Sequence, residues 1–242
     1  MERNESIPYY EQIRAYLIAE IEAGTFPPHT KIPSERNLCT QFGVSRMTVK
    51  HAIQELVSNG RLYTRVGKGT FVSEPPITQQ LNTLTGFSQD MEVLRKSTSS
   101  HVLRAEVVEA GGHVATQLQI APDHLVTFLK RLRLADNQPV ALESSYLNNR
   151  YCKDILDHHD FSTESLYTVL REEYGLTLKY AEQSIKARLA SPKEAKQLNV
   201  AEGFPMLHIT RVTFMDENVP LEYVESVYRG DRYIFRARLT NI

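Results

Sequence analysis

Long apolar runs, closely spaced cysteines and a strong net charge are all missing from this chain of 242 residues. No segment approaches the roughly 20 apolar residues that span a bilayer. Residues 1–5 contain no signal-peptide core, so we expect no membrane partner and no export. The two cysteines, Cys39 and Cys152, lie far apart and show no metal-like spacing. We therefore expect free thiols, no metal and a reducing, cytoplasmic location.

The short motifs of common enzymes do not occur either. G-x-S-x-G, H-E-x-x-H and C-x-x-C are all absent from the sequence. His158 and His159 are adjacent and would face different ways on any regular element, which argues against a metal pair. Glu172 and Glu173 suit a solvated helix face better than an acid/base pair. We therefore expect no catalytic residues and no cofactor.

Residues 33–60 predict two short helices joined by a tight turn. Ser34 can cap the first helix and Gly43 can end it, because glycine readily adopts the left-handed conformation of a C-terminal cap. Ser45 can cap a second helix that runs from Arg46 to about Asn59 and carries an apolar stripe. A helix-turn-helix presents the N-terminal end of its second helix to the DNA major groove. Three polar positions lie at that end: Arg46, Thr48 and Lys50.

Basic residues cluster around this motif. Residues 31–70 contain seven Lys or Arg and two acidic residues, in a chain whose formal net charge is −1. A local positive surface in a near-neutral protein is expected for a DNA-facing surface, although a solvated cationic hairpin would look the same. Residues 61–72 then predict two short strands around a Gly-Lys-Gly turn, a basic wing whose Lys68 can lie near phosphate. The pattern indicates a winged helix-turn-helix.

A change of pattern divides the chain. Two prolines at 75 and 76 and a polar stretch from Ile77 to Asn82 indicate a linker. We therefore expect a DNA-binding domain over residues 1–74, a linker over 75–83 and a second domain over 84–242. The second domain is mildly acidic and is not expected to bind DNA by itself.

An internal repeat organises the second domain. Residues 115–121 resemble residues 195–201, at an offset of 80, and each copy continues with a long strand, a polar turn and a returning strand. Further strands are expected at about 101–109, 177–190 and 234–240, and helices at about 87–95, 151–157, 165–174 and 192–199. This mixture predicts an antiparallel α+β fold.

Two arginines in the first copy are candidate ligand residues. Arg131 and Arg133 are two apart on a strand and so project to one face. A hairpin centred on Asn137 places Glu143 opposite Arg131, so a salt-bridged sheet face is one interpretation. The other is an anion held by both arginines, with Glu143 accepting from hydroxyl groups. Ser165 likewise suits either a helix cap or a ligand contact.

Several motifs carry a family resemblance. Pro33-Ser34-Glu35-Arg36, Phe42-Gly43-Val44-Ser45-Arg46 and Gly67-Lys68-Gly69-Thr70-Phe71-Val72 occur in this order. Together they resemble the N-terminal domain of GntR-family transcription regulators. The resemblance implies operator contacts at Arg36, Arg46, Thr48, Lys50 and Gly67. The helix cap Ser45 and the wing residue Lys68 complete our set of candidate DNA-binding residues.

The rest of the chain resembles the UTRA effector domain of the HutC subfamily, whose fold is similar to that of chorismate lyase. The resemblance rests on Leu84-Thr85-Gly86-Phe87-Ser88, Lys130-Arg131-Leu132-Arg133, Leu142-Glu143-Ser144-Ser145-Tyr146, Ser165-Leu166-Tyr167 and Leu221-Glu222-Tyr223, with Tyr228 further on. It implies a pocket for a small anionic metabolite, often a phosphosugar such as an amino-sugar phosphate. The implied effector-binding residues are Phe87, Ser88, Arg131, Arg133, Glu143, Ser165, Tyr167, Glu222 and Tyr228.

These resemblances imply a transcription regulator, most simply a repressor, whose DNA binding is controlled by the metabolite. One chain offers one reading helix, so we expect a homodimer on a palindromic site in double-stranded operator DNA. Two alternatives stay open: a second domain that only dimerises, and a lyase-like enzyme.

Overall fold

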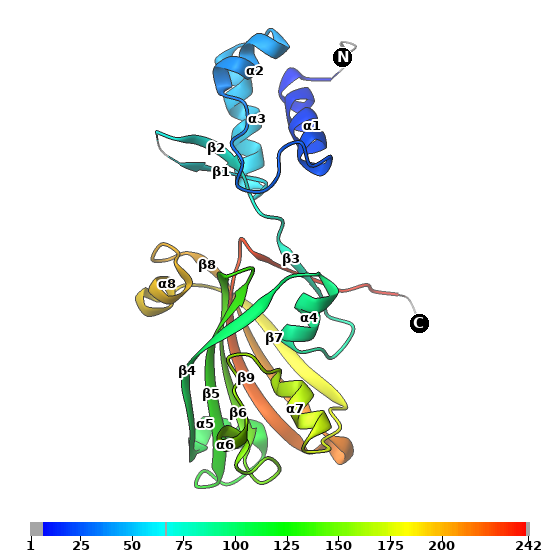
Figure 1. Cartoon of the computed structure of the whole chain (residues 1–242), viewed down its shortest axis with the longest axis vertical. Coiled ribbons are helices and arrows are strands. Elements are labelled where there is room, and N and C mark those ends of the chain that lie inside the picture. The colour runs from blue at the N-terminus through cyan, green and yellow to red at the C-terminus, as the bar shows by residue number, and fades with distance from the viewer. Residues whose placement is uncertain (1–6, 66, 241–242) are drawn as a thin grey trace. The chain divides into compact units, whose positions relative to one another are not determined.

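The computed structural model describes residues 7–65 and 67–240, which form two units (Figure 1). One unit ends at Pro76 and the other begins at Ile77. Among the described residues, no helix is long and apolar enough to cross a membrane.

Three helices and a hairpin form the first unit. Its elements are α1 (Tyr9–Glu22), α2 (Glu35–Phe42), α3 (Arg46–Ser58), β1 (Leu62–Arg65) and β2 (Gly69–Val72). The predicted caps are confirmed: the Ser34 and Ser45 side chains accept from the N–H groups of Asn37 and Thr48, and Gly43 is left-handed with φ 66°. One apolar core joins the three helices to the hairpin, and its fully buried residues include Ile13, Leu17, Leu38, Val49 and Ala52.

The predicted wing is an antiparallel hairpin. Leu62 pairs with Val72, and Arg65 pairs with Gly69. The turn needs glycine at both ends, because Gly67 and Gly69 have φ values of 72° and 117°. The first unit is therefore a winged helix-turn-helix.

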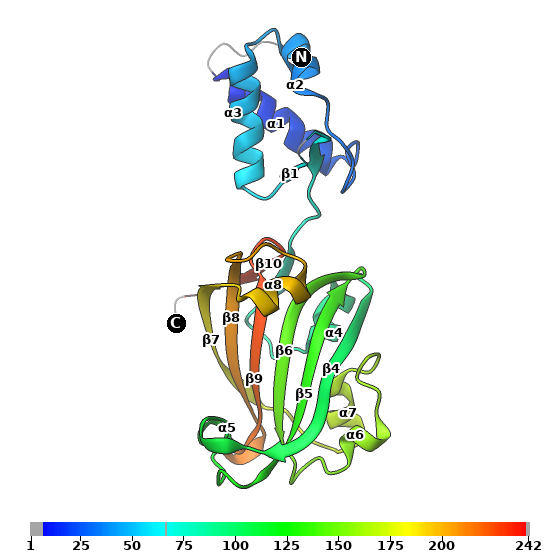
Figure 2. The same cartoon turned by 90° about the vertical axis from the view of Figure 1, so that its left-hand side faces the viewer.

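The second unit is built on a six-stranded antiparallel sheet in the order β4-β5-β6-β9-β8-β7. This is the predicted α+β class, and Figure 2 shows the sheet face on. The strands of the sheet are β4 (Thr98–Glu109), β5 (Leu125–Ala135), β6 (Gln138–Asn148), β7 (Tyr180–Leu189), β8 (Pro205–Phe214) and β9 (Pro220–Arg229). The helices are α4 (Phe87–Val93), α5 (Gly111–Leu118), α6 (Ile155–His158), α7 (Leu166–Glu172) and α8 (Pro192–Leu198), with a 3-10 turn at Asp216–Asn218.

The internal repeat is a structural repeat. The order β4-α5-β5-β6 recurs as β7-α8-β8-β9, and the two copies meet where β6 pairs with β9. Equivalent details recur 80 residues apart: Gln119 and Asn199 both end their helices in the left-handed conformation. The two copies therefore form one continuous sheet, with strands β6 and β9 at its centre.

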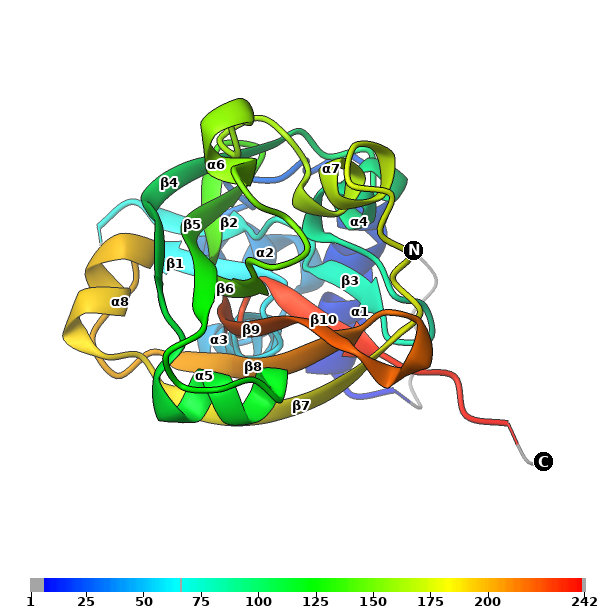
Figure 3. The same cartoon turned by 90° about the horizontal axis from the view of Figure 1, so that it is seen from below.

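Helices α4, α6 and α7 and a small second sheet lie on one side of the curved sheet, and α5 and α8 lie on the other side (Figure 3). In the small sheet, β3 (Ile77–Gln80) pairs in parallel with β10 (Tyr233–Arg236). Strand β3 lies within the expected linker at 75–83, and its four residues belong to the second unit. The polar stretch concealed a buried position, since Gln79 is 6% exposed. The helix expected at 151–157 also forms later and is shorter, as α6.

Candidate functional site

The first turn of α3 presents the candidate DNA-reading side chains to solvent. Arg46 has 81% of its side chain exposed, and its Nε lies 3.3 Å from Glu35 Oε2, leaving the two terminal nitrogens outward. Lys50 is exposed one turn later. The Ser45 and Thr48 hydroxyl groups lie 2.9 Å apart, so their first role is the helix cap. Other exposed candidates are Arg36 on α2 and Gly67 and Lys68 in the wing.

All nine candidate effector residues line one cavity on the covered side of the sheet. They come from the start of α4 (Phe87, Ser88), β5 (Arg131, Arg133), β6 (Glu143), the start of α7 (Ser165, Tyr167) and β9 (Glu222, Tyr228). The volume of the cavity that is accessible to water is about 40 Å³. This volume holds a few water molecules but is too small for a whole sugar. The sequence motifs thus meet in space, although they are spread over some 140 residues of chain.

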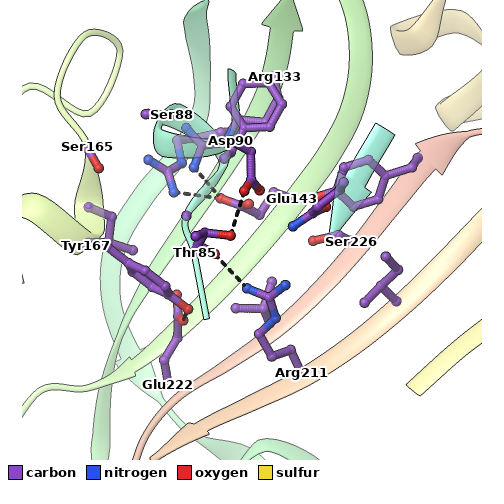
Figure 4. Close-up of a pocket in the computed structure, with 18 residues that line it drawn as sticks. Thr85, Ser88, Asp90, Arg133, Glu143, Ser165, Tyr167, Arg211, Glu222 and Ser226 are labelled. Atoms are coloured by element: carbon purple, nitrogen blue, oxygen red, sulfur yellow. Dashed lines mark hydrogen bonds and ion pairs between the residues drawn. The ribbon is translucent and has the colours of Figure 1, made fainter. Parts of the chain in front are cut away.

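A buried ion-pair cluster forms the positive end of this cavity. Arg131 pairs with Glu143 in the sheet register, as predicted. Glu143 Oε1 accepts from Arg131 Nη2 at 2.6 Å and from Arg133 Nη2 at 2.8 Å, and Figure 4 shows Arg133 and Glu143 meeting. Arg133 also donates to Ser100 Oγ at 2.9 Å. The salt-bridge interpretation is therefore realised in the structure.

Electrostatics hold both arginine and carboxylate in their charged forms. Burial alone would raise the pKa of Glu143, but Arg133 and Arg131 lower it to about 2. Burial and the neighbouring Arg133 lower the pKa of Arg131 to about 10, still well above neutral. Two positive charges thus face one negative charge.

This cluster leaves hydrogen-bond donors unused. Arg131 Nε and Nη1 and Arg133 Nε are buried and have no partner among the described residues. Buried donors without partners are rare in folded proteins and are costly. The two guanidinium groups can therefore satisfy further acceptors.

Two further carboxyl groups that line the cavity, those of Glu222 and Asp90, have raised pKa values. Burial and the nearby Glu143 raise the pKa of Glu222, although the Tyr167 hydrogen bond opposes this. Tyr167 donates its hydroxyl proton to Glu222 Oε2 at 2.8 Å and lies 3.0 Å from Thr213 Oγ1. Burial also raises the pKa of Asp90, which accepts a 2.5 Å hydrogen bond from Thr85. These hydroxyl and carboxyl groups can form hydrogen bonds with the hydroxyl groups of a ligand.

The two serine candidates have different local roles. Ser165 caps α7, because its side chain accepts from Thr168 N. Ser88 does not cap α4: the capping position is Gly86, and it provides no side-chain hydrogen bond. Ser88 faces the same cavity with its hydroxyl free of any hydrogen bond within the described chain.

Sequence reasoning missed Arg211 on β8. Its Nε donates to Gln183 Oε1 at 2.8 Å and its Nη1 to the Thr85 carbonyl at 3.2 Å, which fastens the segment before α4 to the sheet (Figure 4). The repeat held a signal, since Arg211 is the equivalent of Arg131 at the offset of 80. Other missed lining residues are Gln79, Thr85, Asp90 and Ser226.

His159, which we did not expect to bind metal, lies between two carboxylates. Its Nδ1 is 3.2 Å from Glu164 and its Nε2 is 3.4 Å from Glu173. The ligand atoms of the three residues lie within 4.8 Å of one another. The carboxylates approach opposite nitrogens of one ring, whereas a metal ion would be bound by only one of these nitrogens.

Comparison with known proteins identifies both units. Residues 9–72 match the family of bacterial regulatory proteins called gntR, and residues 94–234 match the UTRA domain. The HTH-type transcriptional repressor NagR of Bacillus subtilis is 34% identical, over 95% of this chain and 93% of that protein. The mannosyl-D-glycerate transport/metabolism system repressor MngR of Escherichia coli is 29% identical, over 94% of each chain.

Solved structures agree with this assignment. The crystal structure of PhnF from Mycobacterium smegmatis is similar with a TM-score of 0.70 and 27% identity, over 95% of this chain and all of that chain. The relatives are regulators and not enzymes, which removes the lyase alternative. This chain therefore belongs to the GntR family, as a DNA-binding transcription regulator with a UTRA effector domain.

Proposed function

We propose that this regulator is a repressor that leaves its operator when an anionic metabolite, most simply a sugar phosphate, occupies the arginine cavity. The observation that carries the proposal is the set of three buried guanidinium nitrogens on Arg131 and Arg133 without partners. A phosphate group accepts several charge-assisted hydrogen bonds and would add the negative charge that Glu143 alone does not supply.

The rest of the cavity supports a polyhydroxylated ligand, such as an amino-sugar phosphate. Ser88 and Ser165 add hydroxyl groups to the cavity lining, and Glu222 and Tyr228 suit sugar hydroxyls. MngR is named for mannosyl-D-glycerate, a sugar that carries a carboxylate, so an anionic sugar fits the kind of metabolite found among relatives.

A ligand of this size requires the cavity to open. The space is too small for a sugar as it stands, and the Arg211 bond to Thr85 is one contact that keeps it closed. Breaking that contact would release the segment between β3 and α4. Such a change can alter DNA binding only if the ligand prefers one arrangement of the chain over another.

The DNA-bound form in this proposal is a homodimer on a palindromic operator in the cytoplasm, because each chain carries one reading helix. We place the end of the DNA-binding domain near residues 74–76, and we assign β3 to the effector domain. The competing proposal, a UTRA domain that only dimerises, requires the two arginines to serve the fold alone. Because the two arginines share the single carboxylate of Glu143, a fold-only role would leave one positive charge unbalanced, which favours the ligand proposal.

Calorimetry with sugar phosphates and their unphosphorylated parents tests the proposal. We expect the phosphates to bind with at least tenfold preference, since charge-assisted hydrogen bonds contribute about 1.5–3 kcal/mol each. Arg133 is 5% exposed and ion-paired, so the suitable variant is Arg133→Lys, which keeps the charge but loses the planar fork. Equal binding of phosphates and parents, or normal phosphate binding by Arg133→Lys, would assign the arginines to the salt bridge alone.

A further inference from the structure

We propose that Met47 is a specificity-determining residue that contacts the C5-methyl group of a thymine in each operator half-site. This inference rests on the DNA-binding function of the first unit. It concerns a residue that was not among the candidates drawn from the sequence.

Exposure sets Met47 apart from the other apolar residues of α3. Met47 is 73% exposed, whereas Val49, Ala52, Ile53 and Leu56 form the buried face of the same helix. Among the described residues of this unit, the other exposed large apolar side chains are those of Ile7 (42% exposed) and Tyr9 (45% exposed). Met47 therefore contributes little to the core.

A single exposed apolar side chain carries little information by itself. The position of Met47 on the helix is what makes its exposure informative. It follows Arg46 in the first turn of α3 and lies three residues before Lys50, on the same exposed face. Arg46 Nε donates a hydrogen bond to Glu35, so the two terminal nitrogens of Arg46 stay available for the edge of a guanine. Met47 thus lies between Arg46 and Lys50 in the chain, at the end of a recognition helix that enters the major groove.

The chemistry of the groove then restricts what Met47 can read. Every base edge in the major groove presents polar donors or acceptors, and only thymine adds an apolar group, its C5-methyl. A thioether side chain has no hydrogen to donate and adapts easily to an apolar surface. Met47 can therefore favour thymine over cytosine at one base pair, beside the base pair that Arg46 contacts.

The test removes one methyl group at a time. The full-length protein first selects a preferred duplex from a random-sequence library, and each thymine of that duplex is then replaced by deoxyuridine. Wild-type protein is expected to lose about fourfold in affinity at one thymine per half-site, the value for one buried methyl group. Met47→Ala is expected to bind the thymine and deoxyuridine duplexes equally at that position, and Met47→Leu to restore the difference.

Lys68→Ala is the matched control, because it weakens binding to every duplex and keeps the dependence on the methyl group. Thermal unfolding of Met47→Ala is expected to match wild type, since the side chain is exposed. The inference is overturned if wild type ignores every methyl group, or if Met47→Ala keeps the full methyl dependence. Failure to select any preferred duplex would instead remove sequence-specific DNA binding, and this inference with it.

Discussion

Glu143 is the single residue on which the arginine cavity depends. Its pKa of about 2 in the folded protein lies below the ordinary value of 4.5. A carboxyl group with a depressed pKa stabilises the fold above its unfolded pKa, and this contribution is lost as the pH falls toward 2. Glu143 therefore stays charged at neutral pH and restrains two buried arginines.

Removing that charge gives the first prediction. Glu143→Gln leaves two buried guanidinium groups without a counter-charge, so we expect a loss of about 3–5 kcal/mol of unfolding free energy at pH 7. The difference from wild type should shrink between pH 4.5 and pH 2, where wild-type Glu143 itself becomes protonated. Urea unfolding over this pH range measures both effects. A constant difference at every pH would show that the carboxylate charge is not what stabilises the site.

The same variant reports on anion binding. Inorganic phosphate should raise the melting temperature of Glu143→Gln more than that of wild type, because phosphate can replace the missing negative charge. Equal shifts in the two proteins would place the bound phosphate elsewhere.

At the DNA-binding surface, substitutions of Arg46 and Lys68 distinguish a contact with a base from a contact with phosphate. We expect Arg46→Ala to weaken binding to a selected operator by about 1–3 kcal/mol and to relax specificity at one base pair. Lys68→Ala should weaken all sequences alike and reduce the salt slope by about 0.9. Binding titrations at several salt concentrations distinguish the two. Unchanged operator affinity in Arg46→Ala would mean that α3 is not the reading helix.

Among the elements, α3 begins with a side-chain cap. Ser45 accepts from the Thr48 N–H and so satisfies one of the free donors at the helix start. We expect Ser45→Ala to cost about 1 kcal/mol in unfolding free energy and Ser45→Gly only a few tenths. Thermal unfolding compares them, with Ser34→Ala as the matched control at the start of α2. Equal costs for alanine and glycine would argue against a capping role.

Elements defined by local chemistry were predictable. Ser34, Gly43 and Ser45 act within a few residues of chain, and the Arg131–Glu143 pairing follows from one hairpin centre. The repeat of 80 residues also predicted the equivalent strands. Most of the cavity lining was accessible because family motifs pointed to it.

Elements defined by distant pairing were not predictable. The repeat aligns Arg211 with Arg131, but the β6–β9 pairing that brings the two copies into one sheet has no signature along the chain. The sequence predicts a linker at strand β3, because most of its residues are polar and its partner β10 lies about 150 residues later. Burial of Gln79 depends on that pairing and not on its own hydrophobicity.

For the molecule as a whole, β3 decides where the effector domain begins. We expect the fragment 77–242 to fold, to bind the ligand and to dimerise, because it retains the β3–β10 pair and its core contacts. The matched fragment 84–242 lacks β3 and should melt at a lower temperature. Calorimetry and analytical ultracentrifugation test both fragments. A monomeric 77–242 would move the dimer contact to the first domain, and equal stability would remove β3 from the effector domain.

An anion held by Arg131 and Arg133 is expected to change DNA binding by the full chain. The most direct measurement titrates a panel of sugar phosphates into the complex of the full-length protein with its selected operator and follows DNA release by fluorescence anisotropy. We predict that at least one phosphate releases wild-type protein, that its unphosphorylated parent does not, and that Arg133→Lys binds the operator normally but needs at least tenfold more phosphate for release. Release by the parent sugar at the same concentration, or an unchanged response of Arg133→Lys, would mean that the arginines do not couple anion binding to DNA release.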